Sequence, residues 1–226
     1  MYFLGKGGSH RRPRLAQVAR VLLAAGGVAY TDHRYPIGPG FEAPDFKVDK
    51  ESGALALNLG RAPLLLTPEG DIGQSKSIER YVASLGGLMG KSPVEAARID
   101  MVGEHVRDIK DAQRTKGFSP MSKGKTDEEK AALRGEWFGT DLPSWMARLE
   151  TCLALMAGEG ARHAVGDSIS YADVCIWSLI KDAPPTDAKE VAEAAASCPT
   201  LQCIAEAVAA HPKVAAWVST RPQSMF

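Results

Sequence analysis

The sequence predicts a small α/β domain followed by an all-α domain, and three observations support this order. One stretch, residues 60–83 (GRAPLLLTPEGDIGQSKSIERYVA), has the pattern of a strand, a tight turn, a short strand and a helix. Before it, short apolar runs on either side of a helical segment give a strand–helix–strand pattern. From Pro93 onward, apolar residues repeat at helical spacing over long stretches. Together, the strand–helix–strand pattern and the strand–strand–helix pattern that follows it are typical of a small mixed sheet with helices on its faces.

The elements of the first domain, residues 1–87, are predicted from apolar periodicity and from glycine and proline breaks. Its first helix carries one apolar stripe and is ended by Gly26 and Gly27. One segment mixes two lysines with apolar residues, and its structure stays ambiguous. The predictions are strands at 1–4 and 28–35, a helix at 14–25, loops at 5–13 and 36–44, and the ambiguous segment at 46–59.

The second domain, residues 94–226, is predicted to be all-helical and follows a linker at residues 88–93. Its long helix at 94–116 has one apolar face, and a polar loop follows it. Ser170 and Asp173 have the spacing of a capping box, in which each side chain bonds the backbone of the other. The remaining predictions are helical stretches at 127–158, broken near 139–143, at 170–181 and at 199–210, and a short terminal turn within 211–226.

The composition excludes several classes of function. The 226-residue chain is 45% apolar and 24% charged, as in ordinary globular proteins. Basic and acidic residues balance at 27 each, so the charge gives no argument for nucleic acid or a charged membrane as partner. No apolar run approaches the roughly 18 residues of a membrane span, and the start lacks a secretory signal, so we expect a cytoplasmic location. The four cysteines, Cys152, Cys175, Cys198 and Cys203, have no metal-site spacing, which predicts free thiols and no metal.

The strand–turn–strand–helix stretch also contains the best candidate binding site. Pro63 directly precedes a strand, and a proline there is confined to an edge, a first position or a bulge. The corner formed by Ala62 and Pro63 would present main-chain groups to an extended ligand. Gln74, Ser75 and the N–H groups of the helix start would hold a carboxylate. An ordinary hairpin leading into a capped helix has the same spacing, so the residues alone leave both interpretations open.

The order of these parts resembles the glutathione-binding half of cytosolic glutathione transferases. The sigma class, which includes the haematopoietic prostaglandin D synthases, is the most similar. Three other segments extend the resemblance over most of the chain: YTDHR at 30–34, VGDSISYAD at 165–173 and HPKVAAWVSTRPQ at 211–223. The resemblance implies an N-terminal thioredoxin-like domain, a C-terminal all-helical domain that carries the electrophile site, and a homodimer.

It also implies roles for individual residues toward glutathione, the co-substrate. In the family the matching proline is cis and the Gln-Ser pair binds the γ-glutamyl end, which assigns these roles to Pro63, Gln74 and Ser75. A tyrosine hydroxyl at the end of the first strand stabilises the thiolate in the sigma class, in the sequence Tyr-Phe. Tyr2 is the match here. Ser9 is the alternative, because other classes use a serine after the first strand.

Three further positions are assigned by the same resemblance. The glycyl carboxylate of glutathione needs a cation, and Lys47 and Lys50 are equally good candidates. Arg61 corresponds to a lysine or glutamine close to the ligand. An aspartate of the partner subunit contacts the γ-glutamyl ammonium in the family, but that position is Arg107 here. Asp108 is the substitute, unless the contact is lost.

The electrophile site is expected to be apolar, with Phe118, Met121 and Phe226 as walls. The expected function is a glutathione transferase in which the thiolate attacks small apolar electrophiles. Two alternatives remain: a non-catalytic ligand-binding or structural protein that kept the fold, and a glutathione-dependent peroxidase or isomerase.

Overall fold

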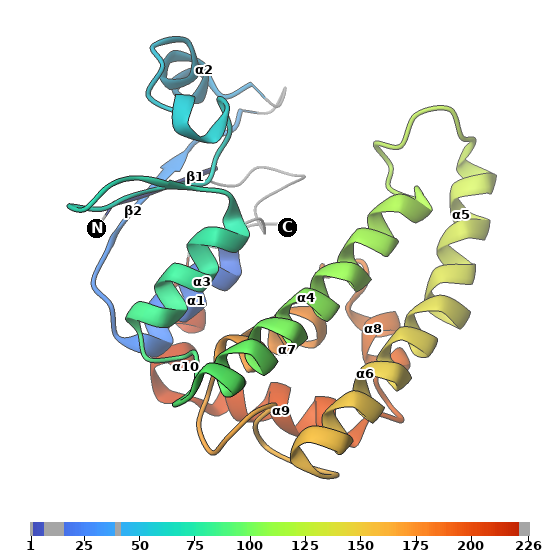
Figure 1. Ribbon diagram of the computed structural model, residues 1–226. Coiled ribbons are helices and arrows are strands. Elements are labelled where there is room, and N and C mark those ends of the chain that lie inside the picture. Colours follow the sequence, from blue (N-terminus) through green and yellow to red (C-terminus); the bar gives the residue numbers. More distant parts are fainter. Residues whose placement is uncertain (1, 7–15, 39–41, 222–226) are drawn as a thin grey trace. The chain divides into compact units, whose positions relative to one another are not determined.

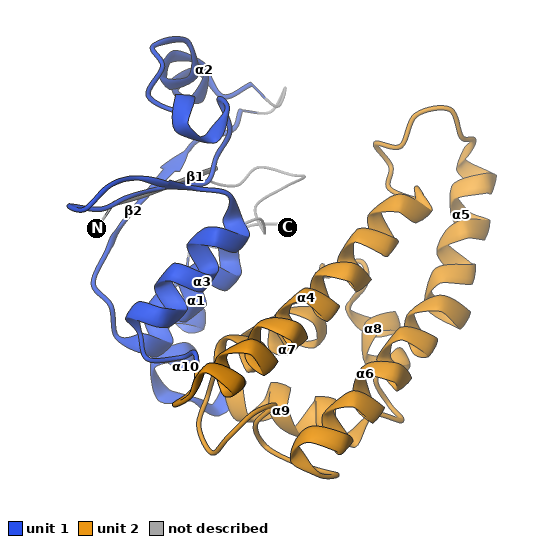
Figure 2. Ribbon diagram, viewed as in Figure 1, with its two compact units in different colours: residues 1–89, 210–226 blue, residues 90–209 orange. Residues whose placement is uncertain are grey.

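The computed structural model describes residues 2–6, 16–38 and 42–221, the first of these ranges through its backbone. Its residues group into two compact units, coloured separately in Figure 2. The first unit comprises Met1–Met89 and Ala210–Phe226, and the helical unit comprises Gly90–Ala209.

The first unit contains a four-stranded mixed sheet with the order β2-β1-β3-β4. Strand β1 (Tyr2–Lys6) lies in the interior of the sheet, parallel to β2 (Thr31–Tyr35) and antiparallel to β3 (Leu64–Leu66). The short strand β4 (Ile72–Gly73) pairs antiparallel with β3. The predicted α/β character of this part is therefore confirmed.

Helices cover both faces of this sheet. Helices α1 (Gln17–Gly26) and α3 (Ser75–Leu85) pack against each other on one face, and α2 (Pro44–Glu51) lies on the other (Figure 1). The ends of α1 and α3 approach so closely that a Cβ atom built on Gly26 would lie 2.7 Å from the Gly86 Cα atom. This glycine is required by space, because such a contact cannot be relieved by turning a side chain.

The α2 face has a small core of its own, which includes the short helix η2 (Ala56–Asn58) that follows α2. Tyr35, Leu55 and Leu64 are fully buried there. The Tyr35 hydroxyl donates a hydrogen bond of 2.7 Å to Asp49 of α2. Burial of the hydroxyl, together with this hydrogen bond to a carboxylate, raises the pKa of Tyr35. The ambiguous segment 46–59 is thus helical, and one tyrosine joins it to the sheet.

The segment at residues 30–34 that carries part of the family resemblance has a structural role. The buried Arg20 guanidinium donates to both carboxylate oxygens of Asp32 at 2.9–3.1 Å, and Arg34 donates to the same carboxylate. Burial lowers the pKa of Arg20, although Asp32 opposes this shift. A buried arginine needs such a partner, so this motif fastens α1 to β2.

The last described helix, α10 (Pro212–Thr220), corrects one prediction. Residues 211–226 were expected to end in a short turn. Instead, Pro212 is the first residue of a helix, a position that suits proline. Helix α10 packs on α1, and the Trp217 side chain hydrogen-bonds to Tyr30. These contacts group the segment with the first unit.

The helical unit is built around α7 (Tyr171–Ile180), all of whose residues are buried, with α4 (Pro93–Lys116) packed along it. The predicted all-helical character is confirmed. The other helices of the unit are α5 (Asp127–Glu136), α6 (Leu142–Ala157), α8 (Ala188–Ala194) and α9 (Pro199–Ala210). None of the described helices combines the length and apolar character that a membrane-spanning segment requires.

The predicted break near residues 139–143 is wrong. Helices α5 and α6 are joined by η3 (Trp137–Asp141), a π-helical turn, in which the Leu142 N–H bonds the Trp137 carbonyl. Pro143 then falls in the first turn of α6, where a missing N–H is tolerated. Lys116 of α4 bonds Glu136, the residue before this turn, at 2.9 Å and Asp141, its last residue, at 2.7 Å.

The predicted capping box at the start of α7 is confirmed. The Ser170 N–H and hydroxyl donate to one oxygen of Asp173 at 2.7 and 2.6 Å, and the Asp173 N–H approaches the Ser170 hydroxyl oxygen. The other Asp173 oxygen accepts from the Ala164 N–H at 2.7 Å. Burial raises the pKa of the Asp173 carboxyl, although these donors and His163 oppose the shift. The motif therefore has a structural explanation.

Candidate functional site

The predicted proline corner lies at the start of β3. The peptide bond between Ala62 and Pro63 is cis, as the resemblance implies, and Pro63 is buried while Ala62 is half-buried. Leu64 pairs with Gly73 across the β3–β4 hairpin. This pairing brings the proline corner and Gln74 together, although they are eleven residues apart.

Helix α3 begins at Ser75, so the predicted Gln-Ser pair stands at a helix N-terminus. Gln74 is its N-cap residue, is exposed, and has a left-handed φ of 64°. Within the part of the chain that the structure describes, the Gln74 side chain makes no capping hydrogen bond, and the first turn of α3 has no acidic residue. This helix start therefore fits an added anion, because first-turn N–H groups have no partner inside the helix.

One residue that sequence analysis missed joins the two parts. Asn58 is buried, and its amide nitrogen donates to the carbonyl oxygens of Arg61 at 2.9 Å and Pro63 at 2.7 Å. Its amide oxygen accepts from the Gln74 N–H at 3.0 Å. No sequence signal could have found it, because it lies in the segment whose structure was ambiguous.

The two candidate lysines both belong to α2, but their surroundings differ. Lys47 is 74% exposed and its Nζ atom lies 3.8 Å from Glu51 of the same helix. The stem of Lys50 lies against Gly60, where an added Cβ would be 3.2 Å from the Lys50 Cε atom. Lys50 is thus next to the turn that leads to the proline corner, where the exposed Arg61 also lies.

The thiolate-stabilising candidates are described only in part. The Tyr2 backbone is in β1, paired with Thr31 of β2 and Leu66 of β3, and its side chain lies outside the described part. Ser9 and Phe226 lie outside the described residues altogether. The structure therefore places the strand that carries Tyr2 beside β3, which begins directly after Pro63.

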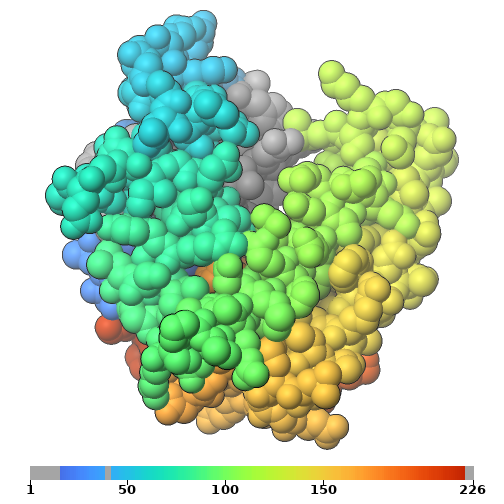
Figure 3. All heavy atoms as spheres, viewed as in Figure 1, coloured from blue at the N-terminus to red at the C-terminus, as the bar shows by residue number. Residues whose placement is uncertain are grey.

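The remaining candidates belong to the helical unit. Phe118 packs on Phe138 with ring centroids 5.9 Å apart, and the Arg134 guanidinium lies 4.5 Å from the Phe138 ring centroid. Met121 is 53% exposed on the connection between α4 and α5, which forms the projecting tip of this unit in Figure 3.

Asp108 lies exposed on α4, and its neighbour Arg107 forms an ion pair with Glu104 of the same helix. Because Arg107 already has a carboxylate partner on its own helix, its charge is partly compensated there. Among the described residues, no group of three or more side chains could hold a metal ion.

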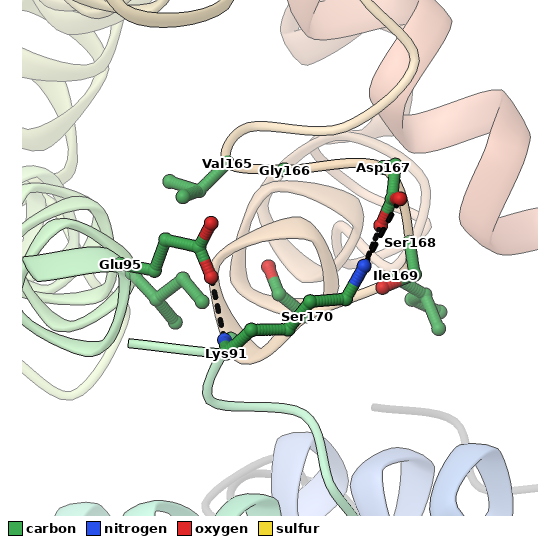
Figure 4. Close-up of a pocket in the computed structure, with 10 residues that line it drawn as sticks. Lys91, Glu95, Val165, Gly166, Asp167, Ser168, Ile169 and Ser170 are labelled. Atoms are coloured by element: carbon green, nitrogen blue, oxygen red, sulfur yellow. Dashed lines mark hydrogen bonds and ion pairs between the residues drawn. The ribbon is translucent and has the colours of Figure 1, made fainter. Parts of the chain in front are cut away.

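A small pocket in the helical unit lies beside the capping box (Figure 4). Its volume is about 20 Å³, which is room for a single water molecule. Lys91, Glu95 and Asp167 are among its lining residues: the Lys91 Nζ atom donates to Asp167 at 2.9 Å, and the Lys91 N–H donates to Glu95. The pocket is too small for a substrate, and its polar groups already bond one another.

Comparisons with known proteins show which family the chain is similar to. The family models for the glutathione S-transferase N-terminal and C-terminal domains match residues 9–84 and 114–221. The chain is 32% identical to a Caenorhabditis elegans glutathione S-transferase P over 163 residues, covering 72% of this chain and 69% of that protein. It is 28% identical to the hematopoietic prostaglandin D synthase of Gallus gallus over 213 residues, covering 92% of each.

A solved structure shows the same fold. The crystal structure of a monomeric glutathione S-transferase from the hookworm Necator americanus superposes with a TM-score of 0.77 at 22% identity. The superposition covers 100% of this chain and 98% of that one.

Proposed function

The chain belongs to the glutathione S-transferase family, and from this premise we propose that it activates the thiol of glutathione for attack on small apolar electrophiles. The observation that carries the proposal is the joining of two predicted parts. The proline corner and the Gln74–Ser75 helix start meet at one end of the β3–β4 hairpin. Glutathione is an extended peptide with a carboxylate at each end. The proline corner offers main-chain groups to its backbone, and the helix start offers donors to one carboxylate.

We assign the two ends of glutathione as follows. The main chain at Ala62 pairs with the extended peptide, as when a strand adds to a sheet. The γ-glutamyl carboxylate binds Ser75, Gln74 and the N-terminus of α3. Lys50 is the better cation for the glycyl carboxylate, because its stem lies against Gly60 whereas Lys47 is paired with Glu51. Arg61 contributes positive charge at the same turn.

The reaction follows from the chemistry of the thiol. A hydroxyl that donates to sulfur favours the thiolate, and each unit of pKa corresponds to about 1.4 kcal/mol. The thiolate sulfur attacks an electrophilic carbon, a carbon–sulfur bond forms, and the leaving group departs with its electron pair. We propose the Tyr2 hydroxyl as the donor, with Ser9 as the alternative, and Phe118, Met121 and Phe226 as apolar walls for the electrophile.

Retention on immobilised glutathione, measured beside turnover of chlorodinitrobenzene, tests the proposal directly. We expect both retention and turnover. Retention without turnover of this substrate or of a hydroperoxide would favour a ligand-binding protein that kept the fold. Reduction of a hydroperoxide alone would favour a glutathione peroxidase. Absence of retention would contradict the whole assignment.

Replacing Ser75 by alanine is expected to weaken glutathione binding by about 1–3 kcal/mol, because the ligand carboxylate loses a donor. The melting temperature should change little, because the N-cap residue Gln74 makes no described side-chain hydrogen bond to the start of α3 that this substitution could break. Calorimetric titration with glutathione and a thermal melt measure the two quantities. A large drop in melting temperature with unchanged affinity would instead assign Ser75 to capping.

We further propose the sigma class and a homodimer, in which Asp108 of the partner subunit contacts the γ-glutamyl ammonium. The similarity to a prostaglandin D synthase over 92% of both chains supports the class. The hookworm relative is monomeric by its description, so light scattering across micromolar concentrations is the direct test. A monomer throughout that range would remove the dimer and the role of Asp108.

A further inference from the structure

We propose that Asn58 is a positioning residue for glutathione, because its side chain fixes both parts of the binding segment. This inference rests on the proposed function. Asn58 has no contact with the ligand in the proposal; it acts through the main chain at Arg61, Pro63 and Gln74. Its amide bonds the backbone on both sides of the β3–β4 hairpin.

The hydrogen bonds of Asn58 all end on backbone atoms of the proposed site. The two N–H groups of the amide donate to the Arg61 and Pro63 carbonyls, one on each side of Ala62. The amide oxygen accepts from the Gln74 N–H, directly before the first residue of α3. A planar amide holds its donors and acceptor at fixed angles, so it relates the proline corner to the helix start rigidly.

The surroundings of Asn58 are shaped to hold this amide. Its side chain is only 4% exposed, so water does not compete for these bonds. A Cβ atom built on Gly73 would lie 2.8 Å from the Asn58 Oδ1 atom and 2.9 Å from its Cγ atom. Gly73 does not have a left-handed φ, so the space taken by Asn58 explains why a glycine stands there.

The conformation of Gln74 gives the bond from Asn58 a further role. Gln74 has a φ of 64°, a region that residues other than glycine seldom occupy. Such a conformation persists where its surroundings determine it. The hydrogen bond to Asn58 is one such determinant, and the pairing of Gly73 with Leu64 is another. The direction of the Gln74 side chain and the first N–H groups of α3 therefore depend on Asn58.

A positioning role predicts a specific kinetic pattern. Without the amide, Ala62 and Gln74 move relative to each other, and both contribute to glutathione binding. The proposed thiol-activating residues lie elsewhere, on β1 and in the segment after it. Glutathione affinity should therefore fall, while turnover at saturating glutathione and the KM for the electrophile should be retained.

Titration and kinetics of three variants test this inference. Asn58→Leu removes all three hydrogen bonds and keeps the branching and the number of side-chain heavy atoms, and we expect the glutathione Kd and KM to rise about 10–100-fold with kcat within about threefold. Asn58→Asp keeps the acceptor for Gln74 but turns a carboxylate oxygen toward the Arg61 and Pro63 carbonyl oxygens, and we expect a rise in both constants at least as large. Tyr30→Phe is the control: it removes the hydrogen bond to Trp217 of α10 in the same unit, lowers the melting temperature, and should leave the glutathione Kd unchanged.

The outcomes separate this inference from the proposed function. If the unmodified protein does not bind glutathione, the proposed function fails. If it binds, and Asn58→Leu and Asn58→Asp bind within twofold of it, the inference alone is overturned. An equal loss of affinity in Tyr30→Phe would also overturn it, because the effect would then follow stability. Should Asn58→Leu fail to fold, Asn58→Asp decides by the same criterion.

Discussion

Replacing Tyr2 by phenylalanine is expected to slow turnover at neutral pH by about tenfold for each unit by which the pKa of the bound thiol rises. The substitution removes one hydroxyl donor and keeps the ring. If this hydroxyl stabilises the sulfur, bound glutathione titrates at higher pH without it, and less thiolate is present at pH 7. Spectroscopic titration of the bound thiolate, beside a pH profile of turnover, measures the effect.

Glutathione affinity should change little in this variant, because the proposed contacts to the peptide lie at Ala62, Gln74 and Ser75. Ser9→Ala is the matched control, since it removes the alternative hydroxyl in the segment that follows β1. A loss of thiolate in Ser9→Ala but not in Tyr2→Phe would assign the donor to the serine. If neither variant alters thiolate formation, the catalytic proposal fails.

The largest effect on stability is expected at Asp173. Asp173→Ala leaves the buried N–H groups of Ala164 and Ser170 without their acceptor, at about 1–3 kcal/mol each. It also opens a cavity beneath α7. We expect the free energy of unfolding to fall by about 3 kcal/mol or more, and the melting temperature by roughly 6–12 °C. Chemical denaturation and a thermal melt measure these changes.

Asp167→Asn is the control for this prediction. It removes a carboxylate from the same loop, but Asp167 is 76% exposed and its ion pair is with the exposed Lys91. Exposed ion pairs contribute little to stability, so its melting temperature should be nearly unchanged. Equal losses in the two variants would show that the loop, and not the buried capping box, determines the stability of α7.

The sequence was sufficient for the elements with strong local signals. The helix start at Ser75, the hairpin after Pro63 and the capping box at Ser170 follow from turn chemistry and from apolar spacing. Helix α2 was missed because it buries no residue fully, and a helix without a buried face has no apolar period. The turn at η3 was mistaken for a break because Gly139 and Pro143 are breakers in isolation, whereas Gly139 lies within the π-helical turn and Pro143 in the first turn of α6.

The candidate site could be predicted only where its residues are close in the chain. Gln74 and Ser75 were recognised as a pair at a helix start, and Pro63 as a corner. The choice between Lys47 and Lys50 could not be made, because it depends on how α2 lies against Gly60. Asn58 could not be found at all: an asparagine side chain has many possible local partners, and the Gln74 N–H that it also bonds is brought to it only by the β3–β4 hairpin.

The first unit consists of two segments of the chain. Helix α10, which follows the helical unit in the sequence, packs on α1 of the first segment. A loop as long as Gly90–Ala209 costs about 4 kcal/mol of entropy to close when it is a flexible chain. Once the helical unit has folded, its two ends are held at a fixed separation, and most of that cost has already been met. The folded helical unit is therefore a covalent linker of fixed length between α3 and α10. Its folding raises the effective concentration of α10 at α1, and so stabilises the unit that carries Pro63 and Ser75.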